Sequence, residues 1–314
     1  MRRACVILSP TAGRAVPVST LREHLRPLVE AGWEVRIEVT DRPGGATAIA
    51  EMAVNAGYDL VVAAGGDGTV SEALQPLVGT DVVLGVLPLG TGNVWAREVG
   101  IPLDLPGAVR VLLEGRVRRV DVGRAGHRNF LLMAGIGFDA AVTRQIDPRR
   151  KRRLGMIAYL VAGVAVAFSF IGHKVQLNVD GVRRTYRALL IVIGNSRRYG
   201  GDVSLTAEAR IDDGLLDVCV FKGTGLVEVA WHLISVLLGR HVHDPGVDYL
   251  RARRLTVVSD SPLPVQVDGD TIGETPMAFT VRARSLNVLV PVRIRPDLFA
   301  ERPEATAQVT GAGG

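Results

Sequence analysis

The sequence predicts an α/β fold with two domains: an N-terminal domain built on a parallel sheet, and a second, mainly antiparallel β domain. Three observations support this prediction. The chain has 314 residues, 47% of them hydrophobic, which is enough to form two cores. Short β-branched runs alternate with helical patterns as far as Asp121. After Asp121, strand-like runs broken by Gly and Asp replace this alternation.

The first part of the chain is expected to alternate strands and helices. Strands are predicted at Ala4–Leu8, Glu34–Val39, Leu60–Ala64 and Val82–Leu87, and helices at Val18–Ala31, Thr47–Ala56, Val70–Leu77 and Asn93–Val99. This order gives a parallel sheet covered by helices on both faces. Such sheets bind ligands beyond the carboxyl ends of their strands, so the loops after these strands are the first candidates for a site.

The second part is expected to be a domain of antiparallel strands. They are predicted at Asn129–Met133, Val175–Val179, Ala188–Ile193, Leu216–Phe221, Leu255–Val258, Val265–Val267 and Leu286–Val290. We therefore predict a first domain at 1–123, a second at 124–296 and a C-terminal tail at 297–314. The tail is expected to be partly disordered, because Glu301–Gly314 is small, polar and without periodicity.

Composition excludes several classes of protein. Cys5 and Cys219 lie far apart in apolar runs, which excludes a disulfide framework and a zinc site. The apolar run Ala4–Leu8 is too short for a signal-peptide core, so a cytoplasmic protein is expected. The net charge of +5, carried mainly by arginine, suits anionic partners. No nucleic acid is expected, because aromatic residues are only 5% and no basic patch is interleaved with them.

One uncharged stretch, Leu154–Gly172, follows the basic run 149–153. A membrane span needs about 20 apolar residues, and this stretch also contains glycine, tyrosine and serine. Three interpretations stay open: a buried or cleft-lining helix, a helix that docks on a membrane surface, and a true span. The basic run would favour anionic lipid.

Two glycine loops follow predicted strands. The strand Leu60–Ala64 leads into Gly65-Gly66-Asp67-Gly68-Thr69, and the strand Val82–Leu87 leads into Pro88-Leu89-Gly90-Thr91-Gly92-Asn93. Glycines allow close approach to a phosphate, and the helix that follows offers unpaired N–H groups. Neither loop contains lysine, which excludes a Walker A loop. Asp67 indicates metal-assisted phosphate chemistry, or else a cap on the following helix.

Together the GGDGT and PLGTGN loops resemble the diacylglycerol kinase catalytic domain family, which includes soluble bacterial diacylglycerol kinases and sphingosine and ceramide kinases. The resemblance covers nearly the whole chain. Further segments that resemble the family are Ser9–Gly13, Gly135–Asp139, Gly194–Gly201, Asp212–Asp217 and Val267–Asp270. The resemblance implies an α/β nucleotide domain and a β-sandwich lipid domain, with ATP in the cleft between them.

The resemblance also implies roles for individual residues. Those expected to bind ATP are Ser9, Thr40, Gly65, Gly66, Asp67, Gly68, Thr69, Glu72, Gly90, Thr91 and Asn93. Mg²⁺ is expected at the side chain of Asp213 and the backbone carbonyls of Arg210 and Leu215, since it prefers oxygen ligands. A plain hairpin turn at Asp213-Gly214, with no metal, is the alternative.

The expected catalytic base is Asp270, which follows Asp268-Gly269. The family usually has glutamate there, so Asp270 is a departure that shortens the reach of the base. An Asp-Gly hairpin turn at this place is compatible with that role. Ser9 and Ala46 are two further departures, because the family commonly has asparagine and aspartate there.

The expected activity is therefore an ATP-dependent lipid kinase that phosphorylates the hydroxyl of a membrane lipid such as diacylglycerol. Its partners would be the lipid substrate and, through peripheral contact, an anionic membrane surface. A homodimer stays open, because no heptad or interface motif appears. Two rivals remain: an NAD kinase-like enzyme with a soluble substrate, and a catalytically weak nucleotide- or lipid-binding regulator.

Overall fold

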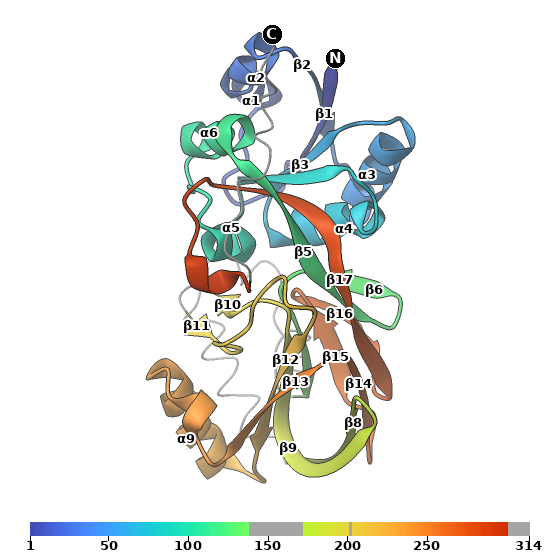
Figure 1. Cartoon of the computed structure of the whole chain (residues 1–314), viewed down its shortest axis with the longest axis vertical. Helices are drawn as coiled ribbons and strands as arrows, with labels where there is room; N and C mark the ends of the chain where they lie inside the picture. The colour runs from blue at the N-terminus through green and yellow to red at the C-terminus, as the bar shows by residue number, and fades with distance from the viewer. Residues whose placement is uncertain (138–171, 201–202, 301–314) are drawn as a thin grey trace. The chain divides into compact units, whose positions relative to one another are not determined.

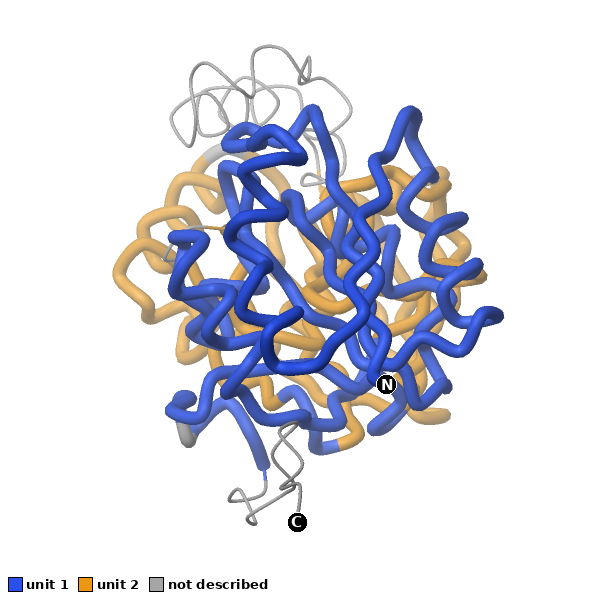
Figure 2. Tube along the Cα trace, turned by 90° about the horizontal axis from the view of Figure 1, so that it is seen from above, with its two compact units in different colours: residues 1–122, 211–213, 283–314 blue, residues 123–210, 214–282 orange. Residues whose placement is uncertain are grey.

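The computed structural model describes residues 1–137, 172–200 and 203–300 (Figure 1). The chain divides into two compact units (Figure 2). Unit 1 comprises Met1–Val122, Ile211–Asp213 and Ala283–Gly314, and unit 2 comprises Gly123–Arg210 and Gly214–Arg282. Neither unit is one continuous stretch of the chain, because residues 211–213 and the chain after residue 282 belong to unit 1. The predicted segment 154–172, apart from Gly172, and the predicted tail beyond residue 300 lie outside the described residues.

Unit 1 is built on a parallel sheet. Its strands are β1 (Arg2–Leu8), β2 (Trp33–Val39), β3 (Leu60–Gly65), β4 (Val83–Pro88) and the end of β17 (Met277–Val290), in the order β2-β1-β3-β4-β17. Every neighbouring pair in this order is parallel. Strand β3 is buried throughout, as expected for a parallel strand covered on both faces. The predicted parallel sheet is confirmed.

The helices of unit 1 follow the strands in the predicted alternation. They are α1 (Val18–His24), α2 (Arg26–Glu30), α3 (Gly45–Asn55), α4 (Asp67–Leu77), α5 (Val94–Val99) and α6 (Leu105–Glu114). The prediction of one helix over Val18–Ala31 was wrong. The helix ends at His24 and restarts at Arg26, because Pro27 lacks the N–H group that a continuous helix requires. Helix α6, capped by Asp104, was not predicted.

Unit 2 is an antiparallel, β-sandwich-like domain. Its strands are β6 (Arg128–Phe130), β7 (Met133–Gly137), β8 (His173–Val179), β9 (Val182–Gly194), β10 (Arg198–Gly200), β11 (Val203–Ser204), β12 (Leu216–Lys222), β13 (Val247–Ala252), β14 (Arg254–Ser259), β15 (Pro264–Val267), β16 (Asp270–Glu274) and the start of β17. The main path is β16-β15-β7-β9-β8-β14-β17, and β9 also pairs with β12. Leu177, Val218, Val265 and Phe279 are completely buried in its core.

Two long strands belong to both units, β5 (Arg116–Ala125) and β17. In β17, residues 277–282 belong to unit 2, and the predicted strand Leu286–Val290 belongs to unit 1, where it pairs with β4. All five of these residues are buried, which fits a parallel strand rather than the antiparallel one predicted.

Helix α9 (Leu226–Leu237) and the short 3-10 helices η1 (His241–His243) and η2 (Pro296–Leu298) were not predicted. Leu298 and Phe299 are buried, so the start of the predicted tail packs in unit 1. Among the residues that the structure describes, no helix has the length and apolar character needed to cross a membrane.

Candidate functional site

Three loops of unit 1 meet at the carboxyl ends of β1, β3 and β4. The N–H of Leu89 donates to the carbonyl of Gly65 at 2.9 Å, and the N–H of Arg14 donates to the carbonyl of Leu89 at 2.7 Å. A Cβ atom on Gly90 would overlap the backbone of Gly66, so only glycine allows the two predicted glycine loops to pack this closely. The sheet edge therefore carries a platform of small residues and backbone N–H groups.

Asp67 joins the two glycine loops. Its carboxylate accepts hydrogen bonds from the N–H groups of Val94 at 2.7 Å and Trp95 at 3.3 Å, which are the first residues of α5. Asp67 thus caps α5 and not its own helix, α4, for which Gly66 is the N-cap. Burial raises the pKa of the Asp67 carboxyl above its ordinary value, although these backbone donors lower it in part.

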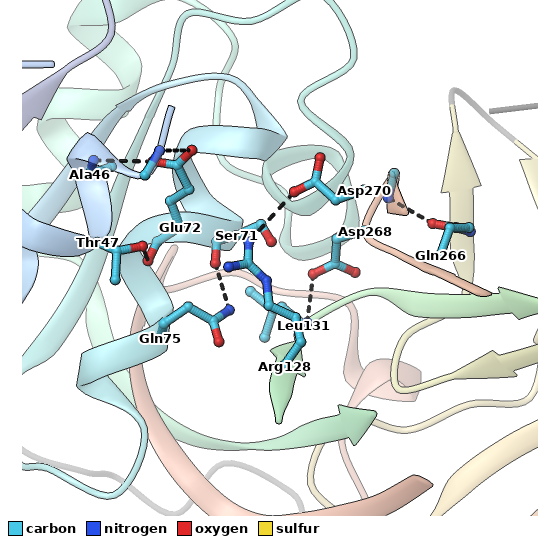
Figure 3. A network of polar contacts seen from close by, with 12 residues as sticks. Ala46, Thr47, Ser71, Glu72, Gln75, Arg128, Leu131, Gln266, Asp268 and Asp270 are labelled. Carbon is cyan, nitrogen blue, oxygen red and sulfur yellow. Dashed lines mark hydrogen bonds and ion pairs between the residues drawn. The ribbon is translucent and has the colours of Figure 1, made fainter. Parts of the chain in front are cut away.

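Glu72 caps a second helix of unit 1. Its carboxylate accepts from the N–H groups of Gly44 at 2.9 Å and Ala46 at 3.1 Å, at the start of α3 (Figure 3). The hydroxyl of Thr47 donates to the backbone carbonyl of Glu72 at 2.9 Å. The N-cap of α3 is Gly44, which has no side chain to bond these donors, so Glu72 supplies the missing cap. Its expected contact with ATP stays a prediction.

Asn93 holds the second glycine loop from within. It is buried, has a left-handed backbone with φ of 49°, and its amide accepts from Gly90 N–H and donates to the carbonyls of Gly90 and Pro88. Its side chain is therefore committed to the loop. The neighbouring Thr91 is exposed, and Gly13 from the first loop lies so close that a Cβ there would be 2.7 Å from the Thr91 hydroxyl.

The remaining predicted hydroxyls lie at the same edge of the sheet. Ser9 directly follows β1, and its hydroxyl is 3.4 Å from that of Thr11. Thr40 directly follows β2, and its N–H donates to the carbonyl of Leu8 at 2.9 Å. Thr69 lies in the first turn of α4, where its side chain covers Gly65. Hydroxyls and N–H groups in such an arrangement are suited to phosphate oxygens.

In unit 2, the predicted motif Asp268-Gly269-Asp270 forms a tight turn between β15 and β16. Asp268 and Gly269 have φ of 47° and 93°, as a type I′ turn requires. The Asp268 carboxylate accepts from three successive N–H groups, those of Leu131 at 2.8 Å and of Leu132 and Met133 at 3.0 Å each (Figure 3). The interpretation as a hairpin turn is confirmed.

The segment Leu131-Leu132 also anchors a second predicted motif. The side chain of Asn195 donates to the carbonyl of Leu131 at 2.9 Å, and its N–H donates to the carbonyl of Leu132 at 2.8 Å. The predicted single strand Asn129–Met133 was wrong, because these two residues leave the strand to bind Asp268 and Asn195. Two motifs far apart in sequence are therefore held by one short segment.

Asp270 begins β16 with its side chain 55% exposed. Its carboxylate lies 3.5 Å from the guanidinium of Arg128, on β6 (Figure 3). Arg128 is the functional neighbour that sequence reasoning missed, since nothing in its local sequence marks it. An exposed carboxylate of this kind can accept a proton, and Arg128 limits the directions in which it points.

The expected metal ligands lie in the segment that leads into β12. Asp212 is buried and is committed to the N–H of Ala300 at 2.6 Å and to Arg118 at 3.8 Å, whereas Asp213 is only partly buried. The alternative of a hairpin at Asp213-Gly214 was wrong, because no strand directly precedes this turn. Within the described ranges no group of three His, Cys, Asp or Glu side chains could hold a metal. One carboxylate with two backbone carbonyls still has the oxygen donors that suit Mg²⁺.

Comparison with known proteins gives matches along both units. The model of the diacylglycerol kinase catalytic domain matches residues 3–125, and that of the YegS C-terminal NAD kinase beta sandwich-like domain matches residues 133–290. A diacylglycerol kinase of Bacillus subtilis is 31% identical over 294 residues, covering 93% of this chain and 97% of the relative. One of Staphylococcus aureus is 30% identical over 292 residues, covering 92% and 93%.

Solved structures agree with the predicted fold class. The crystal structure of a diacylglycerol kinase from Bacillus anthracis superimposes with a TM-score of 0.77 at 24% identity, covering 93% of this chain and 97% of that one. A further structure from this organism gives a TM-score of 0.80, with 24% identity and 94% and 96% coverage. The α/β domain followed by an antiparallel, sandwich-like domain is confirmed.

Proposed function

Because this chain belongs to the diacylglycerol kinase catalytic domain family, we propose that it transfers the γ-phosphate of ATP to the hydroxyl of a membrane lipid, with diacylglycerol as the first candidate. A kinase of this family requires a nucleotide substrate. The observation that best supports the proposal is the meeting of the loops around residues 9–14, 65–69 and 89–93 at one edge of the parallel sheet. Ligands of parallel sheets bind at this edge.

We assign the nucleotide phosphates to these loops of unit 1. Backbone N–H groups of the glycine loops and the hydroxyls of Ser9, Thr40, Thr69 and Thr91 would bind the phosphate oxygens. A carboxylate in the loop would repel phosphate. The charge of Asp67 is offset, however, because it accepts hydrogen bonds from the first N–H groups of α5.

We assign the general base to Asp270. The lipid hydroxyl oxygen forms a bond with the γ-phosphorus while the bond from that phosphorus to the bridging oxygen of ADP breaks, and the hydroxyl proton passes to Asp270. Arg128 orients the carboxylate, and the three hydrogen bonds of Asp268 fix the turn that presents it. Aspartate is shorter than the usual glutamate, so its position must be held more closely.

We assign a magnesium ion to the segment with the Asp213 carboxylate and the carbonyls of Arg210 and Leu215. When bound, Mg²⁺ supplies positive charge that stabilises an anionic loop or phosphate. We further propose a cytoplasmic protein that contacts an anionic membrane peripherally, because its substrate is a lipid. A homodimer stays a prediction.

One alternative has an observation in its favour. The family that matches residues 133–290 is described as an NAD kinase beta sandwich-like domain, so NAD is the acceptor that competes with a lipid.

Phosphate transfer from labelled ATP with Mg²⁺ tests the proposal. The acceptors are a panel of lipids in mixed micelles, with NAD beside them. Asp270→Asn is expected to lower kcat by about 10²-fold to 10⁴-fold, and Asp270→Glu to retain activity. Asp260→Asn is the matched control, because Asp260 is 53% exposed in unit 2 and lies 3.6 Å from His173.

Transfer to a lipid that is lost only in Asp270→Asn would support both the reaction and its base. Formation of labelled NADP would show that NAD, and not a lipid, is the acceptor. If the protein bound ATP but transferred phosphate to no acceptor, the remaining interpretation would be a nucleotide- or lipid-binding regulator. If Asp270→Asn kept full activity on a lipid, the kinase would stand but its base would lie elsewhere.

A further inference from the structure

Helix α9 combines buried polar side chains with strongly exposed apolar ones, although Val229, Leu233 and Val236 of the same helix are partly buried and Val236 packs on the core. His232 is 7% exposed and Ser235 is 5% exposed, whereas Val227 is 81% and Trp231 is 58% exposed. A surface helix of a globular protein normally has the opposite arrangement. In the described part of unit 2, α9 is the single α-helix (Figure 1). One apolar face of the helix is therefore exposed, as far as the described residues show.

Specific contacts fix this orientation. The His232 ring nitrogen Nε2 lies 2.7 Å from the carbonyl of Lys222, and the ring packs edge-on against Phe221 with centroids 5.4 Å apart. Burial would raise the pKa of Asp244, but the hydrogen bond from the Gly246 N–H at 2.8 Å and the polar groups of Ser235 and Trp231 nearby lower it below its ordinary value. The Trp231 ring itself is more than half exposed.

The exposed apolar residues form one continuous stripe. Val227, Trp231, Ile234 and Leu238 are spaced by four, three and four residues, which places them on one face of the helix. Ile234 is 50% and Leu238 is 63% exposed, and Leu237 beside them is also 63% exposed. None of these residues carries a charge. A contiguous apolar patch of this kind marks an interaction surface.

The dimensions of the stripe argue against a second copy of the chain as its partner. A helix of 12 residues is about 18 Å long and about 10 Å wide, which gives a footprint of about 180 Å². A stable protein interface buries about 800 Å² on each partner. A bilayer needs no such area, because a few inserted side chains suffice for reversible binding.

An exposed arginine lies near each end of the stripe, while Glu228 in the first turn of α9 is partly buried beside Gly223. Arg240 is exposed and follows Gly239 at the end of the helix. Arg187 is exposed on β9, and its carbonyl accepts from the N–H of Gly223, just before the helix. Arginine side chains beside an apolar face can reach lipid phosphates while their stems stay in the interface.

We propose that α9 is a membrane-docking helix whose stripe of Val227, Trp231, Ile234 and Leu238 enters the interfacial region of an anionic bilayer. Arg187 and Arg240 bind lipid phosphates at its two ends. This inference rests on the proposed function, because a kinase with a lipid substrate has to reach a bilayer. Trp231 suits the role, since an indole ring combines a large apolar body with a polar N–H, as side chains at membrane interfaces do.

Binding of the full-length protein to vesicles of phosphatidylcholine and phosphatidylglycerol tests the proposal. No ATP or diacylglycerol is added, so kinase activity does not enter the measurement. Cosedimentation gives the affinity. Quenching of tryptophan fluorescence by lipids with brominated acyl chains reports insertion. Trp231 is the tryptophan that such lipids can reach, because Trp33 is 6% and Trp95 is 1% exposed. Trp231→Phe should abolish the quenching.

The test variant is Ile234→Ser with Leu238→Ser, which leaves Trp231 in place. The lipid concentration for half-maximal binding should rise at least about tenfold, because two half-exposed apolar side chains no longer insert. The matched control is Val182→Ser with Val258→Ser, which removes apolar groups that are 58% and 42% exposed on strands of unit 2. It should bind as the wild type does.

Equal binding by both double variants would overturn the proposal. So would a wild-type dimer that the Ile234 and Leu238 substitutions dissociate, since a second copy would then cover the stripe. Protection of Trp231 from iodide in lipid-free protein would place another segment of the chain over it, with the same consequence. The double variant should retain kinase activity in detergent micelles. Vesicle binding without transfer to any lipid would refute the kinase but leave the docking helix intact.

Discussion

Replacement of Asp268 by asparagine should destabilise unit 2 and weaken the enzyme, although Asp268 itself touches no reacting atom. The Asp268 carboxylate accepts three N–H groups, one on one oxygen and two on the other. Asparagine keeps a single acceptor oxygen and turns an NH₂ group toward the remaining N–H. One of the three partly buried backbone N–H groups would then face the NH₂ group of asparagine, and a hydrogen bond to a charged carboxylate would be lost.

The expected cost follows from these contacts. A hydrogen bond to a charged group contributes about 1.5–3 kcal/mol, and a donor left without an acceptor adds a desolvation penalty. We therefore expect Asp268→Asn to lower the free energy of unfolding by about 2–4 kcal/mol. Because Asp270 follows the same turn, kcat should also fall by at least about tenfold, since small displacements of catalytic groups are costly.

The chain offers a close control in Asp180. Asp180-Gly181 forms the same kind of turn between β8 and β9, with φ of 48° and 93°. Its carboxylate also accepts backbone N–H groups, those of Arg253 and Arg254 at 2.8–3.2 Å. Asp180 is exposed, so water can replace the lost bond, and Asp180→Asn should cost about 1 kcal/mol or less.

Urea-induced unfolding followed by circular dichroism measures both variants, and lipid phosphorylation in micelles measures kcat. The reasoning fails if Asp268→Asn and Asp180→Asn are equally destabilised. It also fails if Asp268→Asn unfolds earlier but retains wild-type kcat, because the turn would then hold the fold without positioning Asp270.

Two further predictions concern a glycine and a histidine. Gly90→Ala should destabilise unit 1 by about 1–3 kcal/mol and weaken ATP binding, because its Cβ meets the backbone of Gly66. Gly68→Ala should leave the stability nearly unchanged, since nothing in the protein lies within 4 Å of the added carbon; urea-induced unfolding compares the two variants, and calorimetry measures ATP binding by Gly90→Ala. Burial lowers the pKa of His241, so the stability that the neutral ring supports is complete above the unfolded-state pKa of about 6.5 and is lost as pH falls below it. In His241→Gln, which keeps a donor for the Leu205 carbonyl, urea midpoints should depend less on pH in that range, and an unchanged slope would assign the pH dependence to other groups.

The sequence predicted the sheet of unit 1 because its signals are local. Leu60–Ala64 is a continuous apolar run, as a parallel strand buried on both faces requires, and a glycine turn marks its end. The place of the two glycine loops at one edge then follows from the parallel order alone. Their contact through Asp67 does not, because the pattern around Asp67 also fits a cap on its own helix.

In unit 2 the sequence identified the motifs but not what holds them. Asp268 binds Leu131 across 137 residues of chain, and Asp270 meets Arg128 across 142. No local periodicity encodes contacts over such separations, so Leu131-Leu132 was interpreted as strand and Arg128 was overlooked. Helix α9 was missed for another reason. Its apolar residues lie on more than one face, and His232 and Ser235 take buried positions among them, so no single apolar stripe indicates how the helix packs.

The structure changes how the acidic residues of the glycine loops should be understood. The sequence predicts metal-assisted chemistry or a helix cap for Asp67, and a contact with ATP for Glu72. In the structure both carboxylates accept backbone N–H groups at the start of a helix, Asp67 at α5 and Glu72 at α3, and the contact of Glu72 with ATP stays a prediction. A metal that drew either carboxylate away would leave helix N–H groups without acceptors, at a cost of about 1 kcal/mol or more for each cap. The two carboxylates therefore hold the starts of α5 and α3 in place, and at Asp67 the backbone donors offset part of the negative charge that a nucleotide at this edge would meet.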